Sequence, residues 1–136
     1  MNKLGNIKKS ISLFAIILMI ASTLGYAGFS YFASSKERVY SSEQVLNPRS
    51  AVYYELLSES HLSGTIESSA PISVYIFNGE ELQKLKSGET GTPYKAWENT
   101  KSVVLEATIP KGDYYLVILN PGYESVYVKV SLTNER

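Results

Sequence analysis

Few side chains in this sequence of 136 residues are of the types that carry out catalysis or bind metals. Cysteine is absent, Asp113 is the only aspartate and His61 is the only histidine. A lone histidine cannot form a catalytic triad or a conventional metal site, so we expect His61 to have a structural or surface role, or to form a pH-sensitive contact. A single aspartate also does not supply the acidic cage that calcium requires.

Glutamates are the remaining candidates for acid–base chemistry. They are Glu55, Glu59, Glu67, Glu80, Glu81 and Glu106. Glycosidase-like catalysis requires two carboxyl groups that converge on one cleft and differ in pKa. The spacing does not bring two of these residues together, because most are expected on polar strand faces or on a helix surface. Motifs of phosphate-binding loops, zinc proteases and serine hydrolases are absent as well. The sequence therefore predicts a protein that is not an enzyme and has no cofactor.

Aromatic side chains offer a different chemistry, the binding of a sugar or a protein on a flat platform. Our candidates for this interaction surface are Tyr53, Tyr75, Tyr94, Trp97, Tyr123 and Tyr127. The alternative is that they fill half-buried strand faces, since tyrosine is a good strand residue. Residues 36–136 contain ten Lys and Arg against thirteen Asp and Glu, so we expect no nucleic-acid partner. A small-molecule ligand cannot be named from these residues.

The elements that must position these side chains are mostly strands. Apolar alternation and β-branched or aromatic runs predict strands at 51–57, 62–67, 72–77, 102–109, 114–119 and 124–133. A turn is predicted at 68–71, and the segment 88–101 is polar and rich in turn residues. This spacing predicts an all-β domain at 51–136, an antiparallel, jelly-roll-like β-sandwich of about 7–8 strands. We expect residues 35–50 to form a juxtamembrane linker with an irregular first strand.

One short helix is predicted directly after Asn78. Asn78 is a typical N-cap, and Glu81 lies three residues later, where its side chain can bond back to the cap. Glu80 and Lys84 have the i,i+4 spacing of an ion pair. Gly88 is suited to end the helix.

The stretch from Ile11 to Phe32 is apolar and contains no charged residue. Roughly 20 helical residues cross the hydrocarbon core of a bilayer, so a single transmembrane helix is predicted at 11–34 and lipid is an expected partner. The basic residues in 1–10 place the N-terminus in the cytoplasm and the domain outside the cell membrane. The same pattern also describes a signal peptide that is cleaved after Ala27.

Ala21, Gly25 and Gly28 share one face of the predicted membrane helix. Small residues at this spacing allow a second transmembrane helix to approach closely, which favours other membrane-protein subunits as partners. The alternative is an anchor that contacts only lipid.

The runs PISVYIFNGEELQKLKSG and VVLEATIPKGDYYLVILNPGYESVYVKVSL contain a strand leading into a capped helix and a Pro-x-Gly-x-Tyr-Tyr-Leu-Val turn. The turn residues are Pro110, Gly112, Tyr114, Tyr115, Leu116 and Val117. Over residues 60–133 the chain resembles the jelly-roll sandwiches of the GOLD (emp24-like) and bacterial pre-peptidase C-terminal types. The resemblance implies interaction rather than catalysis. Emp24-like proteins carry a C-terminal membrane span and a disulfide, whereas here the span is N-terminal and cysteine is absent, so cargo transport is not implied.

Three functions remain open at this point. The first is a membrane-anchored, non-catalytic interaction or accessory subunit of a larger membrane complex. The second is an archaeal-type pilin or filament subunit, and the third is a secreted module that binds glycans or peptides. N-terminal sequencing of the mature chain distinguishes them, because they predict a start at Met1, near Ile11 and near Gly28, respectively.

Overall fold

A computed structural model describes residues 11–12, 17–20, 30–33 and 36–136, the first three ranges by their backbone only. In this part of the chain it contains ten strands and one helix. They are β1 (Ile11–Ser12), β2 (Ile17–Ile20), β3 (Ser30–Ala33), β4 (Glu37–Leu46), β5 (Ser50–Leu56), β6 (Ser60–Asn78), α1 (Gly79–Lys86), β7 (Thr90–Gly91), β8 (Lys95–Ile109), β9 (Tyr114–Asn120) and β10 (Val126–Glu135). The all-β prediction with one short helix is confirmed for these residues.

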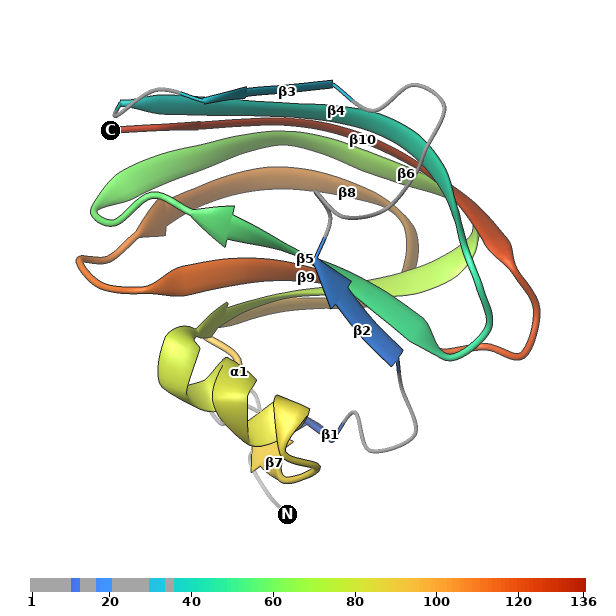
Figure 1. Cartoon of the computed structure of the whole chain (residues 1–136). Coiled ribbons are helices and arrows are strands. Elements are labelled where there is room, and N and C mark those ends of the chain that lie inside the picture. Colours follow the sequence, from blue (N-terminus) through green and yellow to red (C-terminus); the bar gives the residue numbers. More distant parts are fainter. Residues whose placement is uncertain (1–10, 13–16, 21–29, 34–35) are drawn as a thin grey trace, which may run out of the picture.

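Eight of the described strands form one sheet in the order β2-β5-β9-β6-β10-β4-β3, with β8 paired to β6. The two longest strands are β6, with 19 residues, and β8, with 15. The first half of β6 pairs with β10 and its second half with β9, while β8 follows β6 through both halves. The sheet therefore curls into two layers, as Figure 1 shows. The upper layer contains β4 and β10, the lower layer contains β5 and β9, and β6 and β8 run through both.

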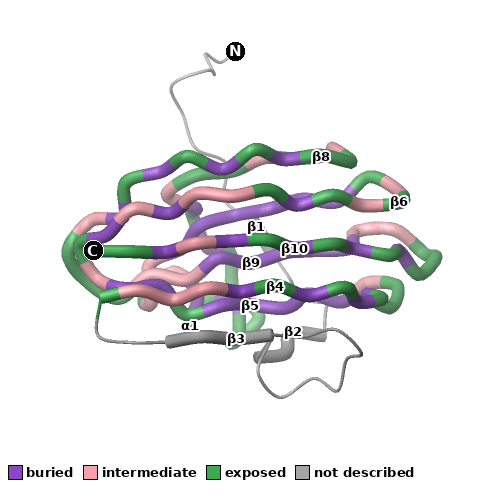
Figure 2. Tube along the Cα trace, turned by 90° about the horizontal axis from the view of Figure 1, so that it is seen from above, coloured by how far each residue is buried: buried purple, intermediate pink, exposed green. Residues whose placement is uncertain are grey.

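Apolar side chains fill the space between the two layers. Along β10, Val126, Val128, Val130 and Leu132 are buried while the residues between them point outward, and Figure 2 shows the same alternation along β4. This period of two is the pattern that the sequence shows, because successive side chains of a strand point to opposite faces. The alternation therefore determines which face of this layer becomes core.

Three polar side chains share this core. Gln44 on β4 donates through Nε2 to the Ser42 Oγ and to the Tyr54 hydroxyl oxygen, each at 3.1 Å. Burial of Tyr54 raises the pKa of its hydroxyl. These hydrogen bonds allow β4 to present Ser42 and the Gln44 amide nitrogen to an otherwise apolar interior, while the Gln44 Oε1 is buried without a hydrogen-bond partner among the described residues.

A second apolar cluster lies on the outer side of the layer formed by β5 and β9. Leu82 and Leu85 of α1 are buried there against Tyr53, Tyr75 and Phe77. α1 thus covers the outer face of this layer, as Figure 1 shows. The layer is apolar on both faces for this reason, which explains why its strands do not alternate in the sequence.

The predicted N-cap of α1 is confirmed, whereas the Glu81 carboxylate contacts Thr92 and Lys84 in place of the predicted bond back to the cap. The Asn78 Oδ1 accepts a hydrogen bond from the Glu81 backbone N–H at 2.8 Å. The structure pairs Lys84 with Glu81, at 3.1 Å between Nζ and Oε2, whereas the sequence predicts a pair with Glu80. Glu81 is held in this position because its Oε1 also accepts from the Thr92 N–H at 2.8 Å.

Two predicted irregular segments belong to long strands. The predicted turn at 68–71 is part of β6, whose register with β8 shifts between Glu67 and Ile72. The polar segment 88–101 contains the first half of β8. Such bulges add residues to one strand and bend it without ending the pairing, so turn-type residues remain inside the sheet.

The predicted membrane helix at 11–34 falls mostly on residues outside the described part. In the rest of this range the backbone forms β1, β2 and β3, where a helix was expected. β2 pairs with β5 and β3 with β4, so part of the backbone polar groups that β4 and β5 would present at the sheet edges are paired. Among the described residues, no helix has the length and apolar character needed to cross a membrane. The packing face of Ala21, Gly25 and Gly28 lies outside the described residues, so it and the anchor stay predictions.

Candidate functional site

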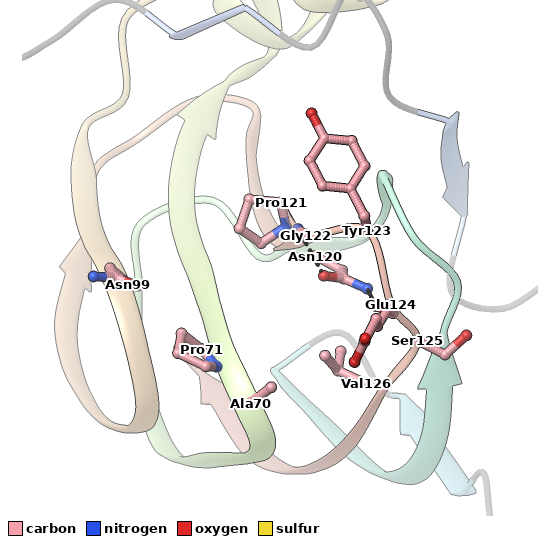
Figure 3. Close-up of a pocket in the computed structure, with 10 residues that line it drawn as sticks. All are labelled: Ala70, Pro71, Asn99, Asn120, Pro121, Gly122, Tyr123, Glu124, Ser125 and Val126. Atoms are coloured by element: carbon pink, nitrogen blue, oxygen red, sulfur yellow. Dashed lines mark hydrogen bonds between the residues drawn. The ribbon is translucent and has the colours of Figure 1, made fainter.

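A pocket with a volume of about 390 Å³ lies at one end of the curled sheet. Three segments line it: Ala70 and Pro71 at the bend of β6, Asn99 in β8, and residues 120–126 between β9 and β10 (Figure 3). Small-molecule sites in proteins usually have volumes of roughly 300–1,000 Å³. We refer to it below as the end pocket.

Irregular strand structure places Asn99 at the pocket. Its φ is 55°, a left-handed conformation that asparagine tolerates better than most residues. The Asn99 backbone N–H donates to the Ser73 Oγ at 3.3 Å, which ties this irregular part of β8 to β6. The register between β6 and β8 shifts on both sides of Ile72. The regular pairing of these two strands is therefore interrupted next to the pocket.

Asn120 is the residue that holds the turn between β9 and β10. Its side chain is buried, and its Nδ2 donates to the carbonyl oxygens of Leu46, Asn47 and Glu124 at 3.1, 3.1 and 2.8 Å. Its Oδ1 accepts from the Gly122 N–H at 3.0 Å. All these partners are backbone groups, so Asn120 shapes the pocket wall and is not free to bind a ligand.

Tyr123 projects from the same turn at the rim of the pocket, with 85% of its surface exposed. The Arg49 guanidinium carbon lies 5.6 Å from the centroid of its ring, within the range of a cation–π contact. Arg49 also donates through Nη1 to the Pro121 carbonyl oxygen at 2.6 Å. In Figure 3 the ring stands beside Pro121 with its hydroxyl pointing away from the pocket. An exposed aromatic ring is thus held in place by its neighbours.

The lining combines apolar groups, neutral polar groups and one carboxylate. Pro71, Pro121 and Val126 present apolar surfaces. The amide of Asn99 can donate to or accept from hydroxyl groups, and the carboxylate of Glu124 can accept from them. Among the described lining residues none is lysine or arginine. In the described part of the chain, no three His, Cys, Asp or Glu residues gather as a metal site would require. The pocket is therefore suited to a neutral, hydroxyl-bearing ligand.

Two of the predicted aromatic residues are buried. Tyr53 and Tyr75 are 9% and 4% exposed and lie beneath α1. The Tyr75 hydroxyl donates to the Glu98 Oε2 at 2.7 Å, and burial, followed by this carboxylate, raises the pKa of Tyr75. The Lys86 Nζ lies 4.6 Å from the centroid of the Tyr53 ring. These two tyrosines attach the helix to the sheet.

The other four predicted residues lie in different places. Tyr94 and Trp97 are half-buried against the main core. Tyr127 is 46% exposed and lies on the outer face of β10, where its hydroxyl donates to the Glu43 Oε1. Of the six, only Tyr123 belongs to the end pocket. The structure therefore does not gather the six predicted residues on one surface.

The sequence does not single out Arg49, Asn99 or Asn120. Asn120-Pro121-Gly122 is a recognisable turn signal, but such a signal does not show which carbonyl groups the asparagine will meet. His61, the lone histidine, lies on the outer face, with its Nε2 at 2.5 Å from the Glu106 Oε2. It does not line the pocket.

The described part of the chain is an all-β domain with one short helix and a small pocket at one end. No known protein family has a model that matches this sequence, and no curated protein matches it. Similar solved structures include the periplasmic g-type lysozyme inhibitor PliG of Aeromonas hydrophila, with a TM-score of 0.49 and 10% identity over 88% of this chain and 97% of that chain.

The pre-peptidase C-terminal domain of a Bacillus anthracis collagenase has a TM-score of 0.44 and 6% identity over 86% of this chain and 93% of that chain. The xylan-binding module CBM86 of Roseburia intestinalis has a TM-score of 0.34 and 15% identity over 96% of both chains. The resemblance to GOLD domains has no counterpart among these structures. Similarities at this level assign neither a family nor a function to the chain.

Proposed function

We propose that this protein is a non-catalytic binding module and that the end pocket is its ligand site. The observation that carries the proposal is the exposed ring of Tyr123, which Arg49 holds at the rim of a pocket of about 390 Å³. Single exposed aromatic side chains are common on protein surfaces, so the support lies in the position of this one: a ring at the rim of a pocket can stack on a bound ligand. The lining contains one carboxylate, so paired acid–base chemistry has no support there.

The ligand class that fits this lining is a neutral sugar. Sugar rings have apolar faces, which can pack on Tyr123 and on the proline rings, and hydroxyl groups, which can bond to Asn99 and Glu124. A phosphate or sulfate would meet Glu124, with no lysine or arginine among the described lining residues. This reading corresponds to the glycan-binding function among the three predicted from the sequence.

Titration calorimetry with neutral oligosaccharides tests this proposal. Galactotriose, mannohexaose and xylohexaose are suitable probes, and we expect at least one of them to bind. The Tyr123→Ala variant should weaken that binding about tenfold, because an aromatic contact of this kind contributes roughly 1 kcal/mol or more.

Tyr127→Ala is the matched control, since it removes an exposed tyrosine outside the pocket and should leave the affinity unchanged. Equal affinity of Tyr123→Ala and wild type would contradict the proposal. Absence of binding across a wider panel of neutral glycans would contradict it as well.

The place of the module in the cell is a separate proposal. The uncharged stretch from Ile11 to Phe32 supports attachment to the cell membrane with the domain outside, as part of a larger membrane complex. Cleavage after Ala27 would release a secreted binding protein that keeps the end pocket but lacks β1 and β2. Either location presents the end pocket to ligands outside the cytoplasm.

A further inference from the structure

Asn78 and Gly79 form the only Asn–Gly dipeptide in the sequence. In such a dipeptide the glycine nitrogen can attack the side-chain amide carbon of the asparagine, because glycine has no side chain to obstruct the approach. The new C–N bond closes a five-membered succinimide ring, and ammonia leaves. Water then opens the ring to aspartate or to iso-aspartate. The other asparagines are followed by larger residues or by proline, so position 78 is the most reactive one in the unfolded chain.

The two reacting groups are held by hydrogen bonds in the folded protein. The Asn78 Oδ1 accepts from the Glu81 N–H at 2.8 Å. The Gly79 N–H donates to the Asp113 carbonyl oxygen at 2.7 Å. The Asn78 ψ of 166° places the Gly79 nitrogen outside the plane that the five-membered ring requires. Ring closure needs this peptide to rotate and the Gly79 nitrogen to lose its proton, and both hydrogen bonds oppose these steps.

The fold itself favours this dipeptide at the start of α1. Asparagine is among the best N-cap residues. A Cβ added at Gly79 would lie 2.4 Å from the Asp113 Oδ2, which also accepts from the Tyr115 hydroxyl at 3.3 Å. The two residues that begin the helix therefore also form the reactive pair.

We propose that Asn78 is a deamidation site that the attached helix α1 keeps unreactive. The helix is attached by Leu82 and Leu85, which are buried in the cluster beneath it, and by the Glu81 Oε1, which accepts from the Thr92 N–H. A short element attached by few side chains can open while the rest of the domain stays folded. Such opening releases the Asn78–Gly79 peptide. The proposal is independent of sugar binding at the end pocket.

The two products differ in their effect on α1. Aspartate caps a helix about as well as asparagine, so this product keeps the start of the helix. Iso-aspartate adds one carbon to the main chain between β6 and α1. The added carbon displaces the backbone groups that pair Asn78 with Tyr114 and Gly79 with Asp113. A chain that contains iso-aspartate therefore cannot attach α1 in the same way, and the cluster beneath the helix is left uncovered.

Peptide mapping by liquid chromatography and mass spectrometry tests the proposal, because it separates the asparagine, aspartate and iso-aspartate forms of the peptide. The full chain is incubated in a mildly alkaline buffer, either folded or unfolded in urea. We expect the folded protein to deamidate at Asn78 at least about tenfold more slowly than the unfolded protein. Asn78→Ser keeps an N-cap and removes the amide, so its peptide should give no product. Equal rates in the folded and unfolded wild type would overturn the proposal.

Two leucine variants test whether α1 controls the reaction. Leu85→Ala weakens the attachment of the helix, whereas Leu105→Ala truncates the same type of side chain in the main core. Urea denaturation gives the global stability of each variant. In native buffer, Leu85→Ala should deamidate several times faster than its global stability accounts for, and Leu105→Ala should not. Rates that follow global stability alone in both variants would overturn the role of α1. If Leu105→Ala fails to fold, Val103→Ala replaces it.

Discussion

At position 64 the surrounding backbone leaves room only for glycine. It has a φ of +137°, and a Cβ added there would lie 2.1 Å from the Ser131 carbonyl oxygen on the adjacent β10. Both the backbone conformation and the close approach of the two strands exclude a side chain. Gly64 therefore allows β6 and β10 to pair in the middle of the upper layer.

We predict that Gly64→Ala lowers the free energy of unfolding by about 2–4 kcal/mol, because backbone strain and overlap with β10 add together. Urea denaturation of both proteins measures the difference. Gly122→Ala is the control: its Cβ would contact only the Asn120 Oδ1, at 3.5 Å. That variant should stay within about 1 kcal/mol of wild type. Similar losses in the two variants would refute the proposed origin of the effect.

At the residue scale, the sequence identifies the right types of side chain but not their surroundings. Tyr53 and Tyr123 are both candidates for an exposed surface, and the structure buries the first beneath α1 and exposes the second. The difference depends on which face of the sheet α1 covers. This is a tertiary contact, and the local sequence pattern does not predict it. The role of Asn120 is not predictable for the same reason, since two of its three carbonyl partners, Leu46 and Asn47, lie more than 70 residues away in the chain.

The helix α1 illustrates the opposite case, because its signals are local. Asn78 is recognisable as the N-cap from the residues directly around it, and the structure confirms it. The contact of Glu81 with the Thr92 N–H is the non-local addition. This hydrogen bond, followed by Lys84, holds the pKa of Glu81 below its ordinary value of 4.5.

A lowered carboxyl pKa has a defined effect on stability against pH. The ionised form of Glu81 is favoured by folding, so its contribution is present above the unfolded pKa and is lost as the pH falls through the folded pKa. We predict that wild type and Glu81→Gln differ in unfolding free energy at about pH 7 and that the difference shrinks as the pH falls through the folded pKa of Glu81, below 4.5.

Urea denaturation at a series of pH values measures this convergence. Glu80→Gln, which changes the exposed residue next to it, serves as the control and should show no such convergence. A constant difference between wild type and Glu81→Gln over the whole range would contradict the assigned role of Glu81.

At the scale of the whole molecule, the two layers are joined through β6 and β8. Each of these strands contributes to both layers, so neither layer can lose its pairing while the other keeps it intact. The sequence predicts separate short strands on either side of residues 68–71, because turn-type residues there conceal a bulge within one strand. The class of the fold was predictable from alternation, whereas this continuity depends on pairing between distant segments.

We predict that the domain unfolds in a single cooperative transition. Differential scanning calorimetry should give a ratio of calorimetric to van't Hoff enthalpy of about 1. Circular dichroism and tyrosine fluorescence should give the same midpoint, because the tyrosines are distributed over both clusters. Two resolved transitions would show that the layers unfold separately and would contradict the prediction.

The position of β10 has a consequence for how the protein is made. β10 lies between β6 and β4 in the upper layer, and its Asn134 binds the Leu57 N–H at 2.6 Å. Both neighbours precede it in the chain, so they leave the ribosome without the strand that joins them. The upper layer can form only after β10 has been synthesised, which leaves the chain unfolded while it is translated. A chain in that state can pass through a translocation channel, and the domain can then fold on the far side of the membrane.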